Sequence, residues 1–423
     1  MKENITQVDE IPQNVKFNDT LEISSNNINY FTHGFFKYPC KFIPHIPRWA
    51  ILKYTCPEDL VLDPFAGSGT TLVEAVLQNR RALGIDFDKL SQLLCITKTT
   101  NLSHKQITYL CDIKEALISQ DKIKKIAFKP DIHNLSHWFP KSTITDLLNL
   151  REKINKIYLK TKDKEIYNFL LVCFAATIRK CSYADAASPK PYVSKRFKKG
   201  PLLVKEVFSK LLDSYLKDIE DYKGRELGGV SIISEDARKI ATHKYDGKVS
   251  LAITSPPYIN AFDYVRSLRL ENSWLGFYGD SNIIDIKKRQ VGTEVISSEV
   301  YRKEINKTKF EKLNSILNMI YKKDKKRAFV VHNFFEDMEK NLIEVRRLLK
   351  DNSHYIIVVG DSKIRGIKVP THEILVDFAK QNGFELVNLF SYIIKNRYLR
   401  IPRSGKGGLI KKDWVIDLVK KNG

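Results

Sequence analysis

Two short segments that lie far apart in the chain constrain the fold most strongly, because each directly follows a short apolar run. Residues 63–71 read DPFAGSGTT and follow the apolar residues 60–62, whereas residues 254–258 read TSPPY and follow the apolar residues 251–253. Short apolar runs bounded by turn signals are typical of buried parallel strands. Since ligands of open α/β sheets collect beyond the carboxyl ends of the strands, the sequence predicts an α/β fold with both segments at one edge of a sheet.

The first segment has the features of a loop that holds a nucleotide-like cofactor. Gly67 and Gly69 permit unusual backbone torsion angles and a close approach to main-chain N–H groups. Thr70 and Thr71 are suited to capping a helix that starts near Leu72. A glycine loop alone is weak evidence, because many helix entries share this pattern.

The next predicted strand strengthens this interpretation. Residues 82–85 are apolar and end at Asp86, which lies 19 positions after Gly67. An acidic residue about 20 positions after the glycine loop reaches the ribose hydroxyls in dinucleotide-binding folds. Two glycines rather than three argue against an NAD fingerprint, and the lack of a Gly-Lys-Ser/Thr sequence argues against a triphosphate P-loop.

Together these motifs resemble those of amino-group DNA methyltransferases that use S-adenosyl-L-methionine, and the Ser-Pro-Pro-Tyr form is most similar to the cytosine-N4 members. The resemblance implies a Rossmann-like methyltransferase sheet with a largely helical insertion. It implies that Asp86 contacts the ribose and that the first loop holds the cofactor. The loop residues concerned are Asp63, Phe65, Ala66, Gly67, Ser68, Gly69 and Thr70.

The resemblance also implies a residue for the cofactor adenine. In that family an acidic residue in a Gly-Asp-Ala-Arg-like turn holds the adenine amino group, and Asp236 in the EDAR sequence at residues 235–238 is the match. Glu235 stands where Gly is usual, and Asp112, after the apolar residues 107–110, is the competing candidate. An N-terminal Tyr-Pro-x-Lys-Phe-x-Pro segment, matched at residues 38–44, is implied to pack near the cofactor.

The second segment suits chemistry on an exocyclic amine, which is a poor nucleophile because its lone pair is delocalised into the ring. Ser255 Oγ and the main-chain carbonyl of Pro256 would accept the two N–H hydrogens of the amine, and the rigid Pro256 and Pro257 would help to aim that carbonyl. Tyr258 would stack on the base after the base is flipped out of the duplex. Alignment and electrostatics then supply the acceleration without a covalent intermediate, so we expect no essential cysteine.

The cysteines and histidines indicate no metal site. The six cysteines form no CxxC pair, and the nine histidines lack metal-ligand spacing, so neither a zinc site nor a disulfide framework is expected. Pro39-Cys40 resembles the Pro-Cys nucleophile of carbon-5 cytosine methyltransferases only superficially. It precedes the cofactor loop, so we do not expect Cys40 to be catalytic.

Charge and hydropathy indicate the partner and the compartment. The chain carries 71 basic and 49 acidic side chains, a net charge of +22 that favours a polyanion, here double-stranded DNA. A Lys-, Ile- and Asn-rich composition also occurs in proteins from AT-rich genomes. The net charge and the active-site motif nevertheless both indicate a nucleic acid as the partner. No apolar stretch approaches the ~20 residues of a membrane span, and residues 1–19 are too polar for a signal peptide. We expect a cytoplasmic protein, with a cognate restriction endonuclease acting separately on the same site.

The spacing of the motifs predicts an insertion. Between Gly69 and Ser255 lie more residues than a few βαβ units of ~30 residues each require. Apolar residues at three-and-four spacing predict helices at 143–158, 164–180 and 202–222, and helices and strands alternate again from residue 336. The resemblance implies that the last two strands form an antiparallel pair. We therefore divide the chain into a first catalytic part at 20–112, a helical insertion at 113–225 and a second catalytic part at 226–423.

Three basic segments are candidates for contacts with the target. Residues 188–200, within the insertion, interleave basic and aromatic side chains, and residues 285–326 are also rich in Lys and Arg. The Gly-rich, basic residues 397–412 would either grip phosphate or form a long hairpin. Asp263 and Tyr264, after the Ser-Pro-Pro-Tyr sequence, would either extend the active-site wall or cap and pack the next helix.

Other functions remain open. An adenine-N6 DNA methyltransferase would use the same geometry, but Asp more commonly begins its catalytic tetrapeptide, so Ser255 favours cytosine. RNA guanine-N2 and protein glutamine methyltransferases also use Pro-Pro-Tyr loops, usually begun by Asp or Asn. A catalytically inactive DNA-binding protein that keeps the fold is the alternative from another class, and the intact glycine loop, Asp86 and Ser-Pro-Pro-Tyr argue against it.

Overall fold

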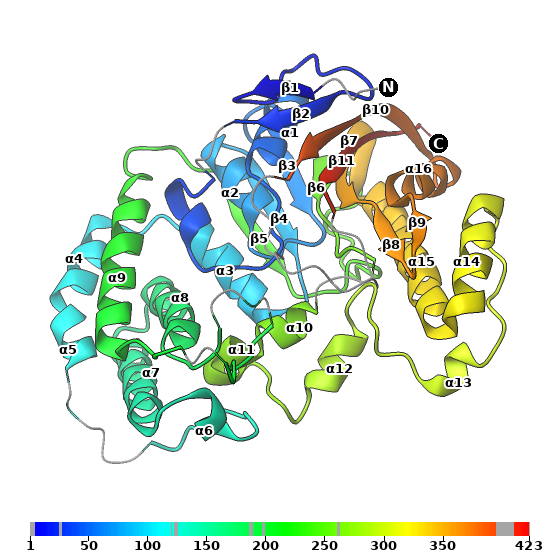
Figure 1. The fold of residues 1–423 in the computed structure, drawn as a ribbon. Coiled ribbons are helices and arrows are strands. Elements are labelled where there is room, and N and C mark those ends of the chain that lie inside the picture. The colour runs from blue at the N-terminus through cyan, green and yellow to red at the C-terminus, as the bar shows by residue number, and fades with distance from the viewer. Residues whose placement is uncertain are drawn as a thin grey trace.

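The computed structural model describes residues 5–24, 28–119, 121, 126–185, 188, 190–196, 199–259, 263–394 and 410–422. Its centre is a nine-stranded sheet with the strand order β1-β2-β10-β11-β7-β6-β3-β4-β5, and β8 and β9 form a separate hairpin (Figure 1). The strands are β1 (Ile5–Val8), β2 (Thr20–Ile23), β3 (Leu60–Asp63), β4 (Arg81–Ile85), β5 (Val230–Ile233), β6 (Val249–Thr254), β7 (Leu349–Gly360), β8 (Ser362–Ile364), β9 (Ile367–Val369), β10 (Phe384–Ile393) and β11 (Lys412–Lys420). The predicted α/β, Rossmann-like class is confirmed.

The sheet is mostly parallel, and its strand order reverses at one place. Along the chain β3 is followed by β4 and β5, which lie on one side of β3, whereas β6 and β7 lie on its other side. Such a switch point leaves a crevice beyond the strand ends, where open α/β proteins bind ligands. β11 runs antiparallel to β10 and β7, which confirms the predicted closing pair.

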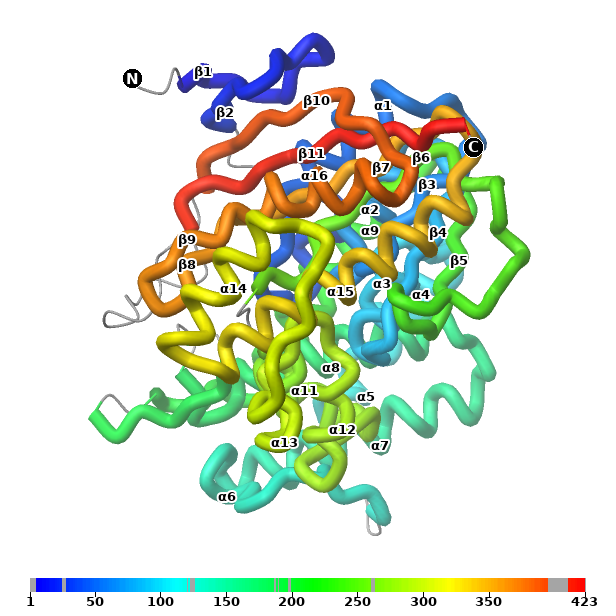
Figure 2. Tube along the Cα trace, turned by 90° about the vertical axis from the view of Figure 1, so that its right-hand side faces the viewer, coloured from blue at the N-terminus to red at the C-terminus, as the bar shows by residue number. Residues whose placement is uncertain are grey.

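Side chains of the central strands alternate between two apolar cores. Leu62 of β3 and Leu83 of β4 join one core, covered by α14 (Glu311–Lys323), α15 (Lys325–Leu348) and α16 (Thr371–Gln381). Val61 and Ala82 join the other core, covered by α1 (His45–Tyr54) and α2 (Thr70–Leu77). Strands that are apolar at every position need cover on both faces, because successive side chains point to opposite sides. Figure 2 shows α14 and α16 on the side turned to the viewer.

A helical body lies beside the sheet, at the lower left of Figure 1. It contains α4 (His104–Asp112), α5 (Lys114–Ile118), α6 (Leu135–Trp138), α7 (Lys141–Thr161), α8 (Lys164–Lys180) and α9 (Val204–Glu220). Its core also includes Phe35 and Phe36, directly after the 3-10 helix η1 (Phe31–Gly34), and residues of α3 (Lys89–Thr99) and α11 (Arg269–Leu275). Segments that come before and after the helical body in the sequence therefore pack into it. None of the helices formed by the described residues is long and apolar enough to cross a membrane.

Most of the predicted elements are confirmed. The helix expected at 164–180 is α8, and the one expected at 143–158 lies within α7. The sequence pattern did not predict β1, β2 and β5, three short strands at the two ends of the sheet. The predicted basic loop at 397–412 falls mainly outside the described residues. The short helices of the second half are α10 (Tyr264–Ser267), α12 (Ile283–Lys288) and α13 (Ser298–Tyr301).

Candidate active site

A pocket lies beyond the carboxyl ends of β3, β4, β5 and β6, at the switch point of the sheet. It encloses about 920 Å³, with the open solvent at its mouth included. The loops after these four strands form most of the wall, together with residues from the segment after η1 and from the loop after α12. The predicted site residues that line it are Phe65, Ala66, Gly67, Ser68, Thr70, Asp86, Asp236, Ser255 and Pro257.

Four predicted site residues do not line this pocket, namely Asp63, Gly69, Pro256 and Tyr258. Asp63 is the last residue of β3, and the other three lie in the same loops as residues that line the pocket. Asp112, the alternative residue for the adenine, is exposed at the end of α4 in the helical body and is absent from the pocket wall. The structure therefore places Asp236, and not Asp112, beside the pocket.

Asp63 connects the two loops. Its Oδ1 accepts hydrogen bonds from the Thr254 hydroxyl at 2.8 Å and the Phe65 N–H at 3.0 Å, and its Oδ2 accepts one from the Thr71 hydroxyl at 2.7 Å. Burial raises the pKa of Asp63 to about 6, although these hydrogen bonds oppose the rise. The carboxyl group thus joins β3, α2 and β6. Gly69 is the N-cap of α2 and no side chain caps it, so the predicted capping role of Thr70 and Thr71 is wrong.

Gly67 and Gly69 adopt backbone conformations that other residues rarely take. Their φ angles are 49° and 79°, which confirms the predicted need for glycine. A Cβ on Gly69 would lie 3.2 Å from Cys95 Sγ of α3, and one on Gly67 would lie 3.5 Å from the Tyr38 ring. The loop is therefore held closely between α3 and the segment after η1.

Asp86 supports the glycine loop from β4. Its Oδ2 accepts a hydrogen bond from the Gly67 N–H at 2.9 Å, and its Oδ1 accepts one from the Asp88 N–H at 2.8 Å. Burial, and then the charge of Asp88, raise the pKa of Asp86 to about 7. Phe87 also lines the pocket, with the Arg289 guanidinium 5.0 Å from its ring centroid. This side of the pocket offers a carboxyl group beside an aromatic ring, which suits a ribose carrying a planar base.

Asp236 lies in the pocket wall after β5 and is bound on both oxygens by Arg238. The Oδ2–Nη2 distance is 2.6 Å and the Oδ1–Nε distance is 2.9 Å. Burial disfavours the charged carboxylate, but the Arg238 hydrogen bonds outweigh it and lower the pKa of Asp236. Arg238 also donates to Asp337 Oδ2 and to the Arg289 carbonyl, each at 2.9 Å. Arg238 therefore ties the turn after β5 to α15 and to the loop after α12.

The segment after η1 closes another side of the pocket with Tyr38, Cys40, Lys41 and Phe42. The Tyr38 hydroxyl lies 2.9 Å from Ser91 Oγ of α3. Lys41 Nζ donates to the carbonyl of His33 at 2.8 Å, and burial lowers the pKa of Lys41 to about 8. The segment thus lies beside the glycine loop, and its packing near the cofactor stays a prediction.

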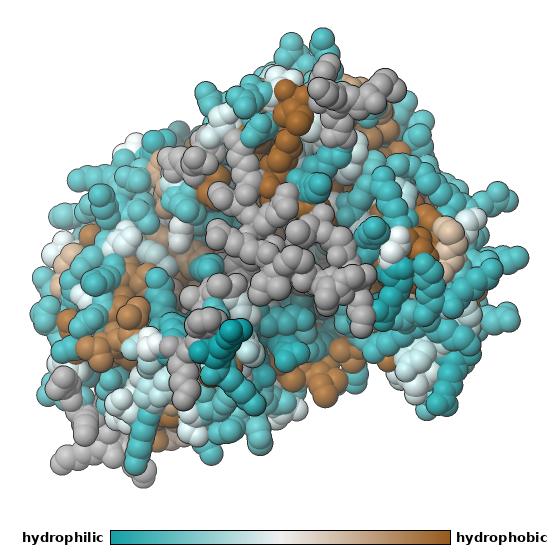
Figure 3. Space-filling model, viewed as in Figure 1, coloured by the Kyte–Doolittle hydropathy of each residue, from teal (hydrophilic) through white to brown (hydrophobic). Residues whose placement is uncertain are grey.

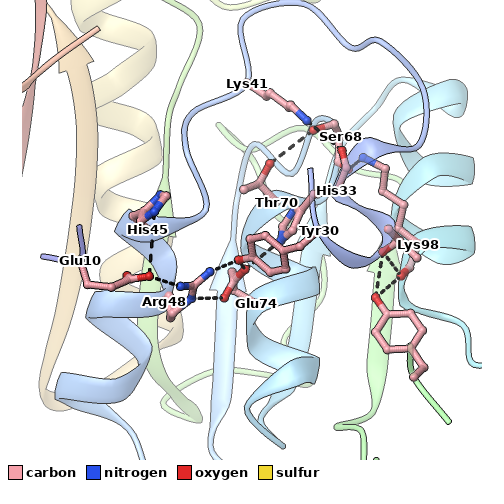
Figure 4. A network of polar contacts seen from close by, with 12 residues as sticks. Glu10, Tyr30, His33, Lys41, His45, Arg48, Ser68, Thr70, Glu74 and Lys98 are labelled. Carbon is pink, nitrogen blue, oxygen red and sulfur yellow. Dashed lines mark hydrogen bonds and ion pairs between the residues drawn. The ribbon is translucent and has the colours of Figure 1, made fainter. Parts of the chain in front are cut away.

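A buried polar network fixes η1 and α1 to α2 (Figure 4). Glu74 of α2 is fully buried, and its Oε1 accepts a hydrogen bond from the Tyr30 hydroxyl and lies 2.8 Å from His33 Nε2. Its Oε2 accepts a hydrogen bond from Arg48 Nε at 3.2 Å. Lys98 of α3 donates to the Ser68 carbonyl at 3.0 Å. The cofactor loop is thus held in place by α2, which follows it, and by α3, which packs against it.

The Ser-Pro-Pro-Tyr loop begins directly after β6. Ser255 and Pro257 line the pocket, whereas Pro256 is buried. The Tyr258 hydroxyl faces Ser255 and Asp413 of β11, and burial followed by the Asp413 charge raises the pKa of Tyr258 well above its ordinary value. The carbonyl of Ile259 accepts a hydrogen bond from the Ser362 hydroxyl at 3.3 Å. Elements β8 and β11 therefore support this loop from behind.

The residues after this loop divide into two roles. Residues 260–262 lie outside the described residues. Tyr264 lines the pocket and stacks on Tyr38 at a centroid distance of 6.3 Å, so it extends the wall. Asp263 accepts a hydrogen bond from the Arg266 N–H at 2.9 Å and pairs with Lys287 Nζ at 2.7 Å, so it caps α10.

Sequence reasoning missed several lining residues. Phe87 and Asp88 directly follow Asp86, and their position next to this predicted ribose contact could have identified them as lining residues. Arg289, Gln290 and Val291 also line the pocket, although their basic segment was predicted only as a candidate for target recognition. Their place in the wall depends on the tertiary packing of the loop after α12, which no local pattern reveals.

Comparisons with known proteins agree with this geometry. Residues 2–92 match the N6/N4 methyltransferase family model, described as DNA methylase. The chain is 26% identical over 410 residues to the type II methyltransferase M.MvaI of Kocuria varians, covering 91% of this chain and 88% of the relative. It is 23% identical over 435 residues to the type II methyltransferase M.BsoBI of Geobacillus stearothermophilus, covering 90% and 84%.

A solved S-adenosylmethionine-dependent methyltransferase from Methanosarcina mazei aligns over 88% of this chain and 97% of its own, at 11% identity and a TM-score of 0.33. The chain is therefore similar to N6/N4 DNA methylases over residues 2–92 and to type II methyltransferases over most of its length, and this similarity agrees with the predicted cofactor S-adenosyl-L-methionine.

Proposed function

We propose that this protein is a site-specific DNA methyltransferase that transfers a methyl group from S-adenosyl-L-methionine to the exocyclic N4 amine of a flipped cytosine in double-stranded DNA. The observation that carries the proposal is the pair of hydrogen bonds by which Asp63 joins the cofactor loop to the strand that ends in Ser-Pro-Pro-Tyr. This connection holds a cofactor loop and an amine-binding loop at one switch point. The relatives named as type II methyltransferases support a role beside a restriction endonuclease.

The pocket residues fit S-adenosyl-L-methionine. The cradle at Gly67 and Gly69 has the positive φ angles and the close neighbours that a loop around a small ligand requires. Asp86 supplies the acceptor for ribose hydroxyls, and Asp236 supplies the one for the adenine amino group. When bound, the cofactor supplies an electrophilic sulfonium methyl group.

The amine-binding loop supplies the groups that activate the target. Ser255 Oγ and the Pro256 carbonyl accept the two amine hydrogens, so that the nitrogen lone pair is freed for attack. Tyr258 and the pocket wall exclude water and position the flipped base. The choice of cytosine over adenine rests on Ser255 as the first residue of the tetrapeptide.

DNA is the partner that the charge favours. The face shown in Figure 3 is mainly hydrophilic, and the chain has a net charge of +22. We assign target recognition to the insertion at 113–225, with its basic segment at 188–200. Part of the other candidate, 285–326, already serves the pocket wall through Arg289, Gln290 and Val291.

The test is transfer of labelled methyl from S-adenosyl-L-methionine to unmethylated genomic DNA, with the product nucleosides separated by mass spectrometry. N4-methylcytosine is the expected product. N6-methyladenine would keep the pocket assignments and correct the base. Label on RNA or protein alone, or on no acceptor, would overturn the proposal.

We expect Asp86→Asn to weaken cofactor binding by about 10- to 100-fold, since a charged acceptor for the ribose is lost. Because the carboxylate is the binding form and the pKa of Asp86 is about 7, wild-type affinity should fall as the pH drops below about 7. Calorimetric titration from pH 5.5 to 8.5 measures both effects. Asp59→Asn is the matched control, since Asp59 accepts a hydrogen bond from the Ser250 hydroxyl near the amino ends of β3 and β6, away from the pocket. Unchanged affinity in Asp86→Asn would move the ribose contact elsewhere.

A further inference from the structure

Asp413 is a buried carboxyl group directly behind the Ser-Pro-Pro-Tyr loop. It is the second residue of β11 and lies opposite Gly360 of β7, at the same edge of the sheet as the pocket, and it is 6% exposed. A Cβ on Gly360 would lie 3.0 Å from Asp413 Oδ1, so only a residue without a side chain leaves room there for this carboxyl group. The proposed binding of cofactor and target base assigns no role to this carboxyl group.

Tyrosine hydroxyls lie beside the Asp413 carboxyl group. The Tyr392 hydroxyl of β10 donates to Oδ2 at 3.1 Å, and the Tyr258 hydroxyl faces the carboxyl group from the catalytic loop. The charge of Asp413 also reaches Tyr264 in the pocket wall. Oδ1 is buried and has no hydrogen-bond partner among the residues that the structure describes. A buried carboxyl group that keeps a free acceptor position and lies beside tyrosine hydroxyls of the catalytic loop and β10 suits acceptance of a proton.

The Tyr258 hydroxyl interacts with both Asp413 and Ser255, and Ser255 lies in the same tetrapeptide and lines the pocket. We propose that the Asp413 carboxylate takes up the proton that the target amine releases during methyl transfer, through the hydroxyls of Ser255 and Tyr258. The inference rests on the proposed function and assigns to Tyr258 a role additional to stacking.

The amine nitrogen bonds the methyl carbon, the bond from that carbon to the sulfonium breaks, and its electron pair goes to sulfur. The nitrogen then carries a positive charge and loses one N–H proton to Ser255 Oγ. Ser255 passes its own hydroxyl proton to Tyr258 Oη, and Tyr258 passes its proton to Asp413. The product amine is neutral, and Asp413 ends as a carboxylic acid that later returns its proton to solvent.

The ionisation of Asp413 suits this role. Burial raises its pKa to about 6, while the hydroxyls of Tyr258 and Tyr392 oppose the rise. The group is therefore mainly a carboxylate at pH 7.5 and is more basic than an exposed aspartate. Since only the carboxylate accepts a proton, transfer by the wild type should fall as the pH drops below about 6.

The test is the rate of single-turnover methyl transfer to DNA at saturating cofactor from pH 5 to pH 8.5. We expect Asp413→Asn to lower the rate about tenfold at pH 7.5, less than direct acid–base catalysis provides, because solvent can still take the proton. Its rate should also lose the decline below pH 6. Asp413→Asn with the wild-type rate and the wild-type pH profile would overturn the inference.

Two further variants keep the test decisive. Tyr392→Phe removes a hydrogen bond that favours the charged carboxylate, so the acid decline should move to higher pH, and an unmoved midpoint would count against Asp413. Asp417→Asn is the matched control, because Asp417 is fully buried on the same strand but binds His354 Nδ1 at 2.6 Å. It should leave the midpoint unchanged. A wild type that methylates no DNA refutes the proposed function, whereas an active wild type with an insensitive Asp413→Asn refutes this inference alone.

Discussion

Ser255→Ala is expected to lower the rate of methyl transfer about 10²- to 10³-fold, the usual effect of removing one preorganised hydrogen-bonding group from an active site. Ser255 lies at the end of β6, where its position is fixed by the bond from Thr254 to Asp63. Its hydroxyl is one of two acceptors for the target amine, so its loss leaves the nitrogen lone pair delocalised. Single-turnover rates with DNA measure the effect.

Cofactor affinity separates this effect from damage to the pocket. Ser255→Ala removes no group assigned to the cofactor, so the dissociation constant for S-adenosyl-L-methionine should stay within about twofold, well under 1 kcal/mol. Ser250→Ala is the matched control, because Ser250 lies at the other end of β6 and its hydroxyl donates to Asp59 Oδ1 at 2.6 Å. It should keep the wild-type rate. A fast Ser255→Ala enzyme would show that another group binds the amine.

The central strands and the motif loops could be predicted from the sequence because their signals are local. Leu62 and Ile253 lie in short apolar runs, and each run ends where a loop with unusual chemistry begins. The 19-residue spacing from Gly67 to Asp86 is likewise a local signal, because both residues belong to one βαβ unit. In the structure the Gly67 N–H donates a hydrogen bond to Asp86 Oδ2 at 2.9 Å. Such features need no knowledge of distant parts of the chain.

The remaining site residues depend on distant pairings. Asp413 approaches Tyr258 only because β11 pairs with β7 in one register, and a shift by one residue would turn its side chain to the other face. Asp63 likewise reads as a cofactor residue in the sequence, although its oxygens are used by Thr254, Phe65 and Thr71. Periodicity carries no information about these pairings.

Glu74→Ala is expected to lower the free energy of unfolding by about 3–5 kcal/mol, since removing one partner of a buried ionic network leaves the others uncompensated. Glu74 is 0% exposed and binds Tyr30, His33 and Arg48. Urea denaturation at pH 7 measures the loss. Glu10→Ala is the matched control, because the Glu10 side chain also pairs with Arg48 but is 55% exposed. An exposed pair contributes about 1 kcal/mol or less.

The pH dependence tests the cause of this loss. Burial alone would raise the pKa of Glu74, but His33 and Arg48 outweigh it, so the folded pKa lies below the ordinary 4.5. A lowered folded pKa means that the carboxylate stabilises the fold above about pH 4.5 and that this contribution disappears as the pH falls through the folded value. The difference between wild type and Glu74→Ala should therefore be constant from pH 6 to 8 and shrink below pH 4.5. A difference that persists at lower pH would assign the loss to packing of the α2 helix rather than to the charge that fixes the N-terminal segment beside the cofactor loop.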